Sequence, residues 1–131
     1  MVMRYLCSCA ILFLSLTGTS RAGDHTKDSL QTVKQGVASQ KALLVDVREN
    51  DEWKEGHIKG AKHLPLSQLQ KGVNKEQLKQ VLPEGKIIYL YCAAGGRCLK
   101  AADLLKKQGI DVRALKPGYE ALVRAGFENA P

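Results

Sequence analysis

Aromatic side chains are scarce in this chain of 131 residues, where Trp, Tyr and Phe together make up 5%. Proteins that bind single-stranded nucleic acids interleave aromatic and basic side chains, and no segment here has that arrangement. The excess of Lys and Arg, a formal net charge of +7, therefore indicates a solvated surface or a field that attracts small anions. We expect no nucleic acid partner. Internal repeats and low-complexity stretches are also lacking, so nothing indicates a second domain.

The sequence has no apolar run of the roughly 20 residues that a membrane-spanning helix needs. The apolar run at residues 5–16 is shorter, follows a basic start and precedes Ser20-Arg21-Ala22, where small residues suit a signal peptidase. We expect residues 1–22 to be a secretory signal peptide cleaved after Ala22, so that the protein is periplasmic or secreted. The alternative is a retained single-helix anchor. After cleavage we expect no stable membrane insertion.

Cleavage would leave about 109 residues, enough for one domain with one core, which we expect to be a monomer. It removes two of the 20 Lys and Arg and none of the 13 Asp and Glu, so the net charge falls from +7 to +5. Cys7 and Cys9 leave as well, and the thiols that remain are Cys92 and Cys98.

Apolar segments alternate with amphipathic ones over residues 41–127. This pattern predicts strands over 42–46, 61–64, 86–91 and 112–115. It predicts helices or helical turns over 51–55, 75–82, 97–108 and 119–125, and another turn capped by Ser67. Residues 23–40 form an extension with a possible helix, capped by Asp28 or Ser29. Apolar strands between helices predict an α/β fold, with a central parallel sheet of four to five strands and helices on both faces. Ligands of such sheets bind beyond the carboxyl ends of the strands, where Cys92 lies.

Cys92 ends the apolar run and begins a loop of small residues, followed in order by Ala93, Ala94, Gly95, Gly96, Arg97 and Cys98. At a strand-to-helix turn, backbone N–H groups and the helix dipole favour a negative charge. The glycines permit positive φ angles, so that successive amides can form a nest around an anion. Arg97 adds a charged fork suited to sulfate-like groups. The loop therefore predicts a thiolate nucleophile and anionic substrates, in preference to a buried structural cysteine.

This loop resembles that of the rhodanese sulfurtransferases, and other segments match the same family in order. Leu43–Arg48 is similar to the family's strand ending in Asp-Val-Arg. Gly56–Ala61, with Glu52-Trp53 before it and Pro65 after it, matches Gly-His-Ile-x-Gly-Ala. Leu115–Leu122 is similar to the family's Leu-x-Gly-Gly-x-x-x-Trp tail. The resemblance covers residues 41–127 and implies a rhodanese-like domain of the exported, phage-shock-protein-E-like type.

In that family a cysteine and an arginine separated by four residues accompany sulfur transfer, whereas a loop one residue longer accompanies phosphatases and arsenate reductases. The resemblance therefore implies a persulfide on Cys92, loaded from an anionic donor such as thiosulfate and discharged to a thiol or cyanide. The amides from Ala93 to Cys98 would hold the persulfide, and Arg97 would neutralise the donor. No metal or organic cofactor is required. Ala93 stands where many thiosulfate-using members carry an arginine.

Other residues admit alternative roles. We expect Asp46 and Arg48 to support the loop and a neighbouring carboxylate such as Glu52, and Trp53 to pack at the edge of the core. His57 and His63 could be combined with the two thiols into a metal site, but no pair of these residues has the close spacing of zinc ligands.

Cys98 leaves two alternatives open. It could pack beside the loop, or it could form a disulfide with Cys92 or attack its persulfide as a resolving thiol. The second alternative would make the protein a non-catalytic sulfur-binding or thiol-redox module.

Overall fold

A four-stranded parallel sheet forms the centre of the computed structural model, which describes residues 23–131. Its strands are β1 (Ala42–Asp46), β3 (Lys62–His63), β4 (Ile87–Tyr91) and β5 (Arg113–Ala114), in the order β3-β1-β4-β5. The expected signal peptide, residues 1–22, lies outside the described residues. No helix within residues 23–131 is both long and apolar enough to cross a membrane. The α/β prediction is confirmed, with four strands in the parallel sheet.

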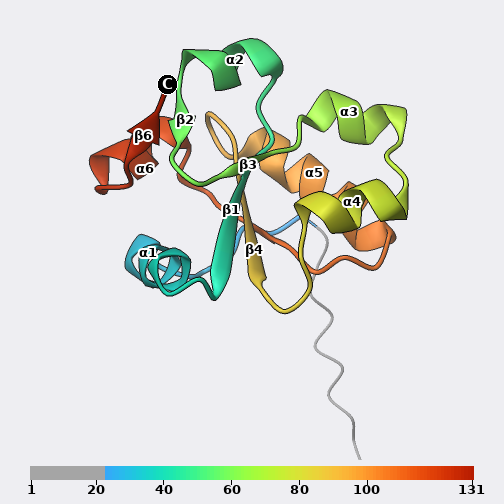
Figure 1. The fold of residues 1–131 in the computed structure, drawn as a ribbon, viewed down its shortest axis with the longest axis horizontal. Helices are drawn as coiled ribbons and strands as arrows, with labels where there is room; N and C mark the ends of the chain where they lie inside the picture. Colours follow the sequence, from blue (N-terminus) through green and yellow to red (C-terminus); the bar gives the residue numbers. More distant parts are fainter. Residues whose placement is uncertain (1–22) are drawn as a thin grey trace, which may run out of the picture.

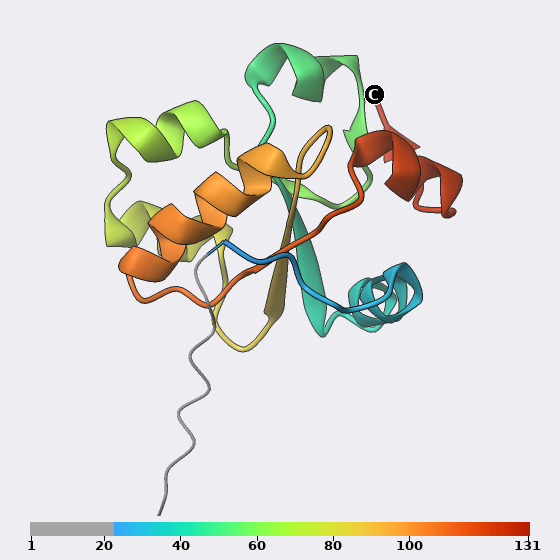
Figure 2. The same ribbon diagram turned by 180° about the vertical axis from the view of Figure 1, so that it is seen from behind.

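Helices cover both faces of this sheet because the side chains of its strands alternate between two apolar clusters (Figures 1 and 2). Ile88 and Leu90 of β4 face α3 (Leu66–Lys71), α4 (Lys75–Val81) and α5 (Gly96–Lys107). Tyr89 and Tyr91 face α1 (Leu30–Ala38) and α6 (Tyr119–Arg124). The uniformly apolar strands thus bury both of their faces, as expected of a parallel sheet.

The segment that precedes the first strand belongs to the same core. Ser29 caps α1 by accepting a hydrogen bond from the Thr32 amide, as the sequence predicts, and Val33 is completely buried. Before the helix, the Thr26 amide donates to the Ala114 carbonyl oxygen at 2.8 Å, so residues 24–28 run beside β5 (Figure 2). Asp28 accepts hydrogen bonds from Tyr89 Oη at 2.6 Å and from Arg113 at 2.7 Å.

Two details of the fold differ from the sequence predictions. Ser67 does not cap the helical turn there: α3 begins at Leu66, and Pro65 occupies the N-cap, where its fixed φ suits a helix start. The Ser67 hydroxyl instead donates to Glu49 at 2.5 Å, next to α2 (Asn50–Glu55). A second, antiparallel pair of strands, β2 (His57–Ile58) and β6 (Asn129–Ala130), was absent from the predicted set. Each of these strands has two residues, too few to show alternation, and neither lies in a longer apolar segment like those predicted around β3 and β5.

Candidate active site

The loop after β4 brings the small residues around the Cys92 sulfur. Cys92 is 1% exposed, and the Gly95 amide donates to its Sγ atom at 3.0 Å. Gly95 is the N-cap of α5 and has a φ of 92°, in the left-handed region that favours glycine. The loop therefore curls back on the sulfur at the start of the longest helix described, as the Gly-Gly pair in the sequence predicts.

The carboxyl-terminal tail presses against this loop. A Cβ atom on Gly95 would lie 2.7 Å from the Lys116 carbonyl oxygen, and one on Gly118 would lie 1.8 Å from the Ala93 carbonyl oxygen. The Tyr119 amide donates to the Cys92 carbonyl oxygen at 2.8 Å. Glycine at these two positions lets the backbone of the tail fix the position of the loop, which explains why the two motifs occur together.

The surroundings of Cys92 favour its charged form. They lower its pKa from 9.0 to about 5, chiefly through a hydrogen bond from the Cys98 thiol, with further hydrogen bonds from the amides of Cys98, Ala94 and Gly95. Burial opposes this shift, because an apolar interior disfavours charge. Since the hydrogen bonds prevail, the sulfur is a thiolate at neutral pH and a ready nucleophile.

Cys98 is a hydrogen-bond donor to this site and is itself completely buried. Its thiol lies 3.0 Å from the Gly95 carbonyl oxygen and 3.1 Å from that of Leu115, and the charged Cys92 sulfur competes for the same proton. That hydrogen bond and burial raise the pKa of Cys98, so it keeps its proton. The two cysteines are both free thiols. A protonated Cys98 is a weak nucleophile, which favours packing and donation over the role of resolving thiol.

Arg97 forms a forked ion pair with Glu52 beside the loop. The two hydrogen bonds measure 2.5 and 2.8 Å, and about a third of each side chain is exposed. The Arg97 guanidinium lowers the pKa of Glu52 to about 2. Arginine has five N–H donors, so this pair leaves others for a substrate anion. Glu52 thus orients the arginine that the sequence places in the site.

Asp46 and Arg48 form a buried pair that supports a different part of the site from the one expected. Arg48 donates to both Asp46 carboxylate oxygens and, at 2.7 Å, to the Gly56 carbonyl oxygen. Its guanidinium carbon lies 4.2 Å from the centre of the Tyr119 ring. The pair therefore joins β1 to the Gly56 turn and to α6. Among the described residues, the side chain of Glu52 bonds with Arg97 and the Glu49 amide and not with this pair.

The two histidines weighed as metal ligands flank Trp53. Its ring stacks on His57 at 3.5 Å and on His63 at 4.6 Å between ring centres, so the tryptophan is half-buried in a stack of rings outside the core. His63 Nε2 bonds with the Arg48 carbonyl oxygen at 2.8 Å. No three His, Cys, Asp or Glu side chains within residues 23–131 gather in a way that could hold a metal ion.

His25 touches the loop although sequence reasoning missed it. Its Nε2 atom lies 2.8 Å from the Gly95 carbonyl oxygen, and Gly95 in turn donates its amide to Cys92. The two partners are 70 positions apart, and no local pattern around His25 signals the contact.

An α/β fold with a cysteine thiolate held by a loop at the carboxyl edge of its sheet defines a class of proteins that use sulfur as a nucleophile. The model of the rhodanese-like domain matches residues 29–125, and the chain therefore belongs to that family. It is 42% identical over 81 residues to the uncharacterized protein YqhL of Bacillus subtilis, covering 61% of this chain and 60% of that protein.

Two further relatives have names that mention sulfur. The putative sulfur carrier protein YrkF of Bacillus subtilis is 36% identical over 98 residues, covering 68% of this chain and 50% of that protein. The chain thus spans about half to three fifths of the lengths of these Bacillus relatives. The structure of the human single-domain sulfurtransferase TSTD1 superposes with a TM-score of 0.61 at 25% identity, covering 74% of this chain and 94% of that one.

Proposed function

We propose that this protein is a sulfurtransferase that carries a sulfane sulfur on Cys92. One observation supports this most strongly: the sulfur is buried among hydrogen-bond donors that lower its pKa to about 5. A thiolate of this kind attacks sulfur, and the donors that hold it are placed to hold a persulfide anion in its place. The names of its relatives YrkF and TSTD1 agree with sulfur chemistry.

The reaction has two steps that return the thiolate. First, Cys92 attacks the outer sulfur of a thiosulfate-like donor, a new S–S bond forms, and the donor's S–S bond breaks with its electron pair leaving on sulfite. Second, a thiol or cyanide attacks the terminal sulfur of the persulfide, and the pair of that S–S bond returns to Cys92. Arg97 would offset the negative charge of the donor and of the departing sulfite.

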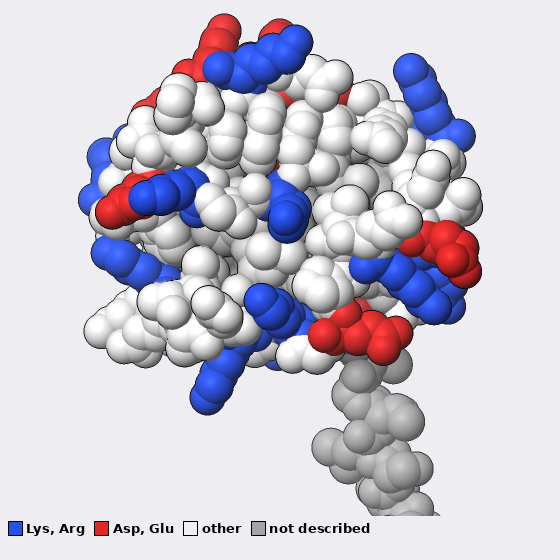
Figure 3. All heavy atoms as spheres, viewed as in Figure 1, with Lys and Arg blue, Asp and Glu red and all other residues white. Residues whose placement is uncertain are grey.

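The proposed setting is outside the cytoplasm. Cleavage of the expected signal peptide after Ala22 would release the domain into the periplasm or the medium, as a monomer without a nucleic acid partner. On the face shown in Figure 3, charged side chains of both signs are scattered and separated by uncharged surface. Such a surface suits small anionic donors better than a polyanion.

Intact mass after incubation with thiosulfate tests the proposal. We expect the protein to gain the mass of one sulfur atom, to lose it on addition of cyanide with release of thiocyanate, and to gain nothing as the Cys92→Ser variant. Lys107→Ala, a change at the exposed far end of α5, is the matched control and should load normally. A wild-type protein that gains no sulfur from thiosulfate or from a second sulfane donor would contradict the proposal.

The redox alternative predicts a different mass. If Cys92 and Cys98 form a disulfide, the isolated protein lacks the mass of two hydrogen atoms and accepts sulfur only after reduction. We expect both thiols to be free in the isolated protein, because the buried Cys98 keeps its proton. Thiol counting under denaturing conditions separates the two functions.

A further inference from the structure

Gly23, Asp24 and His25 form the amino terminus that cleavage after Ala22 would create. We propose that this terminus binds a divalent cation that prefers four nitrogen ligands in a plane, Cu(II) foremost and Ni(II) next. The proposal rests on the export and cleavage included in the proposed function, but not on sulfur transfer itself.

The ligands follow from the position of the histidine. A free terminal amine, the next two amide nitrogens and the imidazole of a third-position histidine can surround one metal ion. Here these are the Gly23 amine, the amides of Asp24 and His25, and the His25 ring. Neither amide belongs to proline, so each can lose its proton to the metal. Planar nitrogen ligands favour Cu(II) and Ni(II), and Cu(II) binds more tightly by the general order of divalent affinities.

The His25 ring has the orientation that this site needs. Its Nε2 atom bonds with the Gly95 carbonyl oxygen at 2.8 Å, which leaves Nδ1 as the ring nitrogen for the metal. Nδ1 is also the nitrogen nearer the backbone, and therefore the one that can bind a metal together with its own amide. Histidine ligands commonly donate their other ring N–H to a carbonyl oxygen, which fixes the ring and its tautomer. The contact with Gly95 supplies this support before any metal arrives.

The backbone ahead of the fold is free to wrap a metal ion. Gly23 and Asp24 are exposed, and a Cβ atom on Gly23 would meet nothing within 4 Å. Within residues 23–131, neither the Asp24 amide nor the His25 amide donates to a protein acceptor. Among the described residues, the first amide that donates to the fold is that of Thr26, at 2.8 Å from the Ala114 carbonyl oxygen. The segment that would bind the metal therefore ends where the anchored segment begins.

A metal ion there would adjoin the active-site loop. The His25 ring contacts Gly95 on one edge, and the Gly95 amide donates to the Cys92 sulfur at 3.0 Å. We therefore expect the bound ion to fix the ring against the loop and not to displace it. The nitrogen ligands are distinct from the sulfur nucleophile, so both can be occupied at once.

Copper titration of the exported protein tests this site. The full chain is expressed for export as Cys92→Ser, which removes the thiolate as a competing ligand, and the mature amino terminus is read from the intact mass. We expect a chain that begins at Gly23, binds one equivalent of Cu(II) with the visible absorption of a planar nitrogen site, and releases protons on binding. Binding should therefore weaken as the pH falls.

Two changes should each weaken binding at least a hundredfold. One is His25→Ala. The other is the chain 22–131, in which retained Ala22 moves the histidine to the fourth position while leaving every described helix and strand intact. His57→Ala, in the ring stack by Trp53, is the control and should bind as the parent does.

Three results would overturn the inference: a mature chain that begins at another residue, unchanged copper affinity in His25→Ala, or equal affinity of the chain 22–131. Because the titration uses Cys92→Ser, it is independent of sulfur loading. Loading of the wild-type protein by thiosulfate is measured separately, so failure of sulfur transfer and failure of metal binding give different results.

Discussion

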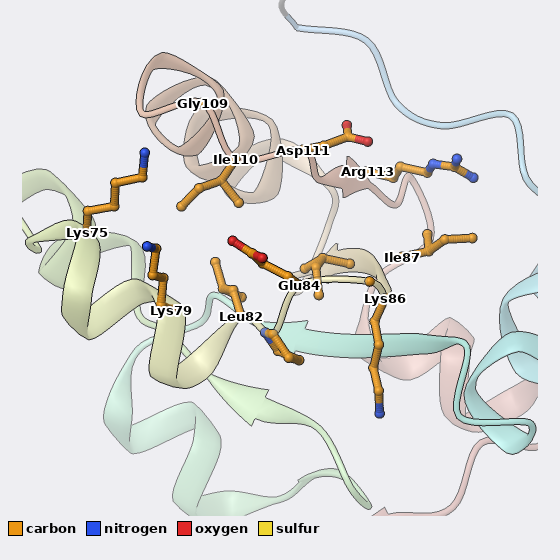
Figure 4. Close-up of a pocket in the computed structure, with 13 residues that line it drawn as sticks. Lys75, Lys79, Leu82, Glu84, Lys86, Ile87, Gly109, Ile110, Asp111 and Arg113 are labelled. Carbon is orange, nitrogen blue, oxygen red and sulfur yellow. The ribbon is translucent and has the colours of Figure 1, made fainter.

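The two ends of the parallel sheet differ in what they offer a ligand. At the amino ends of β4 and β5 there is a hollow of about 390 Å³, lined by Lys75 and Lys79 of α4 and by Glu84 and Ile110 from the loops beside it (Figure 4). At the carboxyl ends, the loop from Cys92 to Cys98 encloses the Cys92 sulfur, which accepts a hydrogen bond from the Gly95 amide. Cys92 is 1% exposed.

The difference shows that an open hollow and a reactive group need not coincide. The lysines of the hollow are exposed, and their amines can extend into water. The Cys92 thiol is removed from water and surrounded by N–H and S–H donors, and there its pKa falls far from its usual value. The strongly shifted thiol therefore lies at the well-packed end of the sheet.

Removing the nucleophile at the carboxyl end of the sheet should have the largest effect on sulfur loading. Cys92→Ser should reduce the single-turnover rate of sulfur loading by at least about a thousandfold, because the attacking atom is lost. Lys79→Ala, the matched change in the hollow, should leave that rate unchanged. Rapid-quench mass spectrometry measures both. An equal loss in the two variants would mean that the hollow takes part in the reaction.

The pH dependence of stability follows from the same thiolate. The native Cys92 binds its proton only below about pH 5, whereas a thiol in the unfolded chain binds it below about pH 9. Between these values the unfolded state holds more protons, so the free energy of unfolding should rise with pH and lose this contribution as the pH falls towards 5. Denaturant unfolding of wild type and Cys92→Ser measures it. Equal slopes in the two proteins would contradict the depressed pKa.

A pair of glycine variants compares the two ends directly. Gly95 and Gly85 have φ angles of 92° and 84°, so alanine at either costs about 1 kcal/mol of backbone strain. A Cβ atom at Gly85 meets nothing within 4 Å, whereas one at Gly95 would lie 2.7 Å from the Lys116 carbonyl oxygen. Gly95→Ala should therefore cost more unfolding free energy than Gly85→Ala. Of the two variants, only Gly95→Ala should raise the pKa of Cys92. Identical effects would show that the tail does not constrain the loop.

The smallest effect should come from Arg97→Lys. Lysine keeps the charge but loses the fork that pairs with Glu52, so sulfur loading should slow by about tenfold. Unfolding free energy should fall by less than about 1 kcal/mol, because a third of each partner is exposed to water. The pKa of Glu52 should rise from about 2, which NMR titration of its carboxyl carbon would detect. Unchanged loading would exclude Arg97 from donor binding.

The sequence predicts the parts of this molecule that rest on local patterns. The strands from Ala42 and Ile87 and the helix after Arg97 follow from continuous apolar spacing, and the loop around Cys92 follows from its glycines. The contacts from Glu52 to Arg97 and from His25 to Gly95 span 45 and 70 positions, and they depend on how the elements pack. Glu49 and Glu52 do form a capping box, a local signal that could have placed Glu52 at the start of α2.

Titration of the Cys92 thiol tests the account most directly. Thiolate absorbance, recorded against pH for the wild-type protein and for Cys92→Ser, isolates the ionisation of this one sulfur. We expect a midpoint near pH 5 that the substitution abolishes. A midpoint near pH 9, the value of an ordinary thiol, would show that the loop does not hold a charged sulfur and would contradict the proposed chemistry.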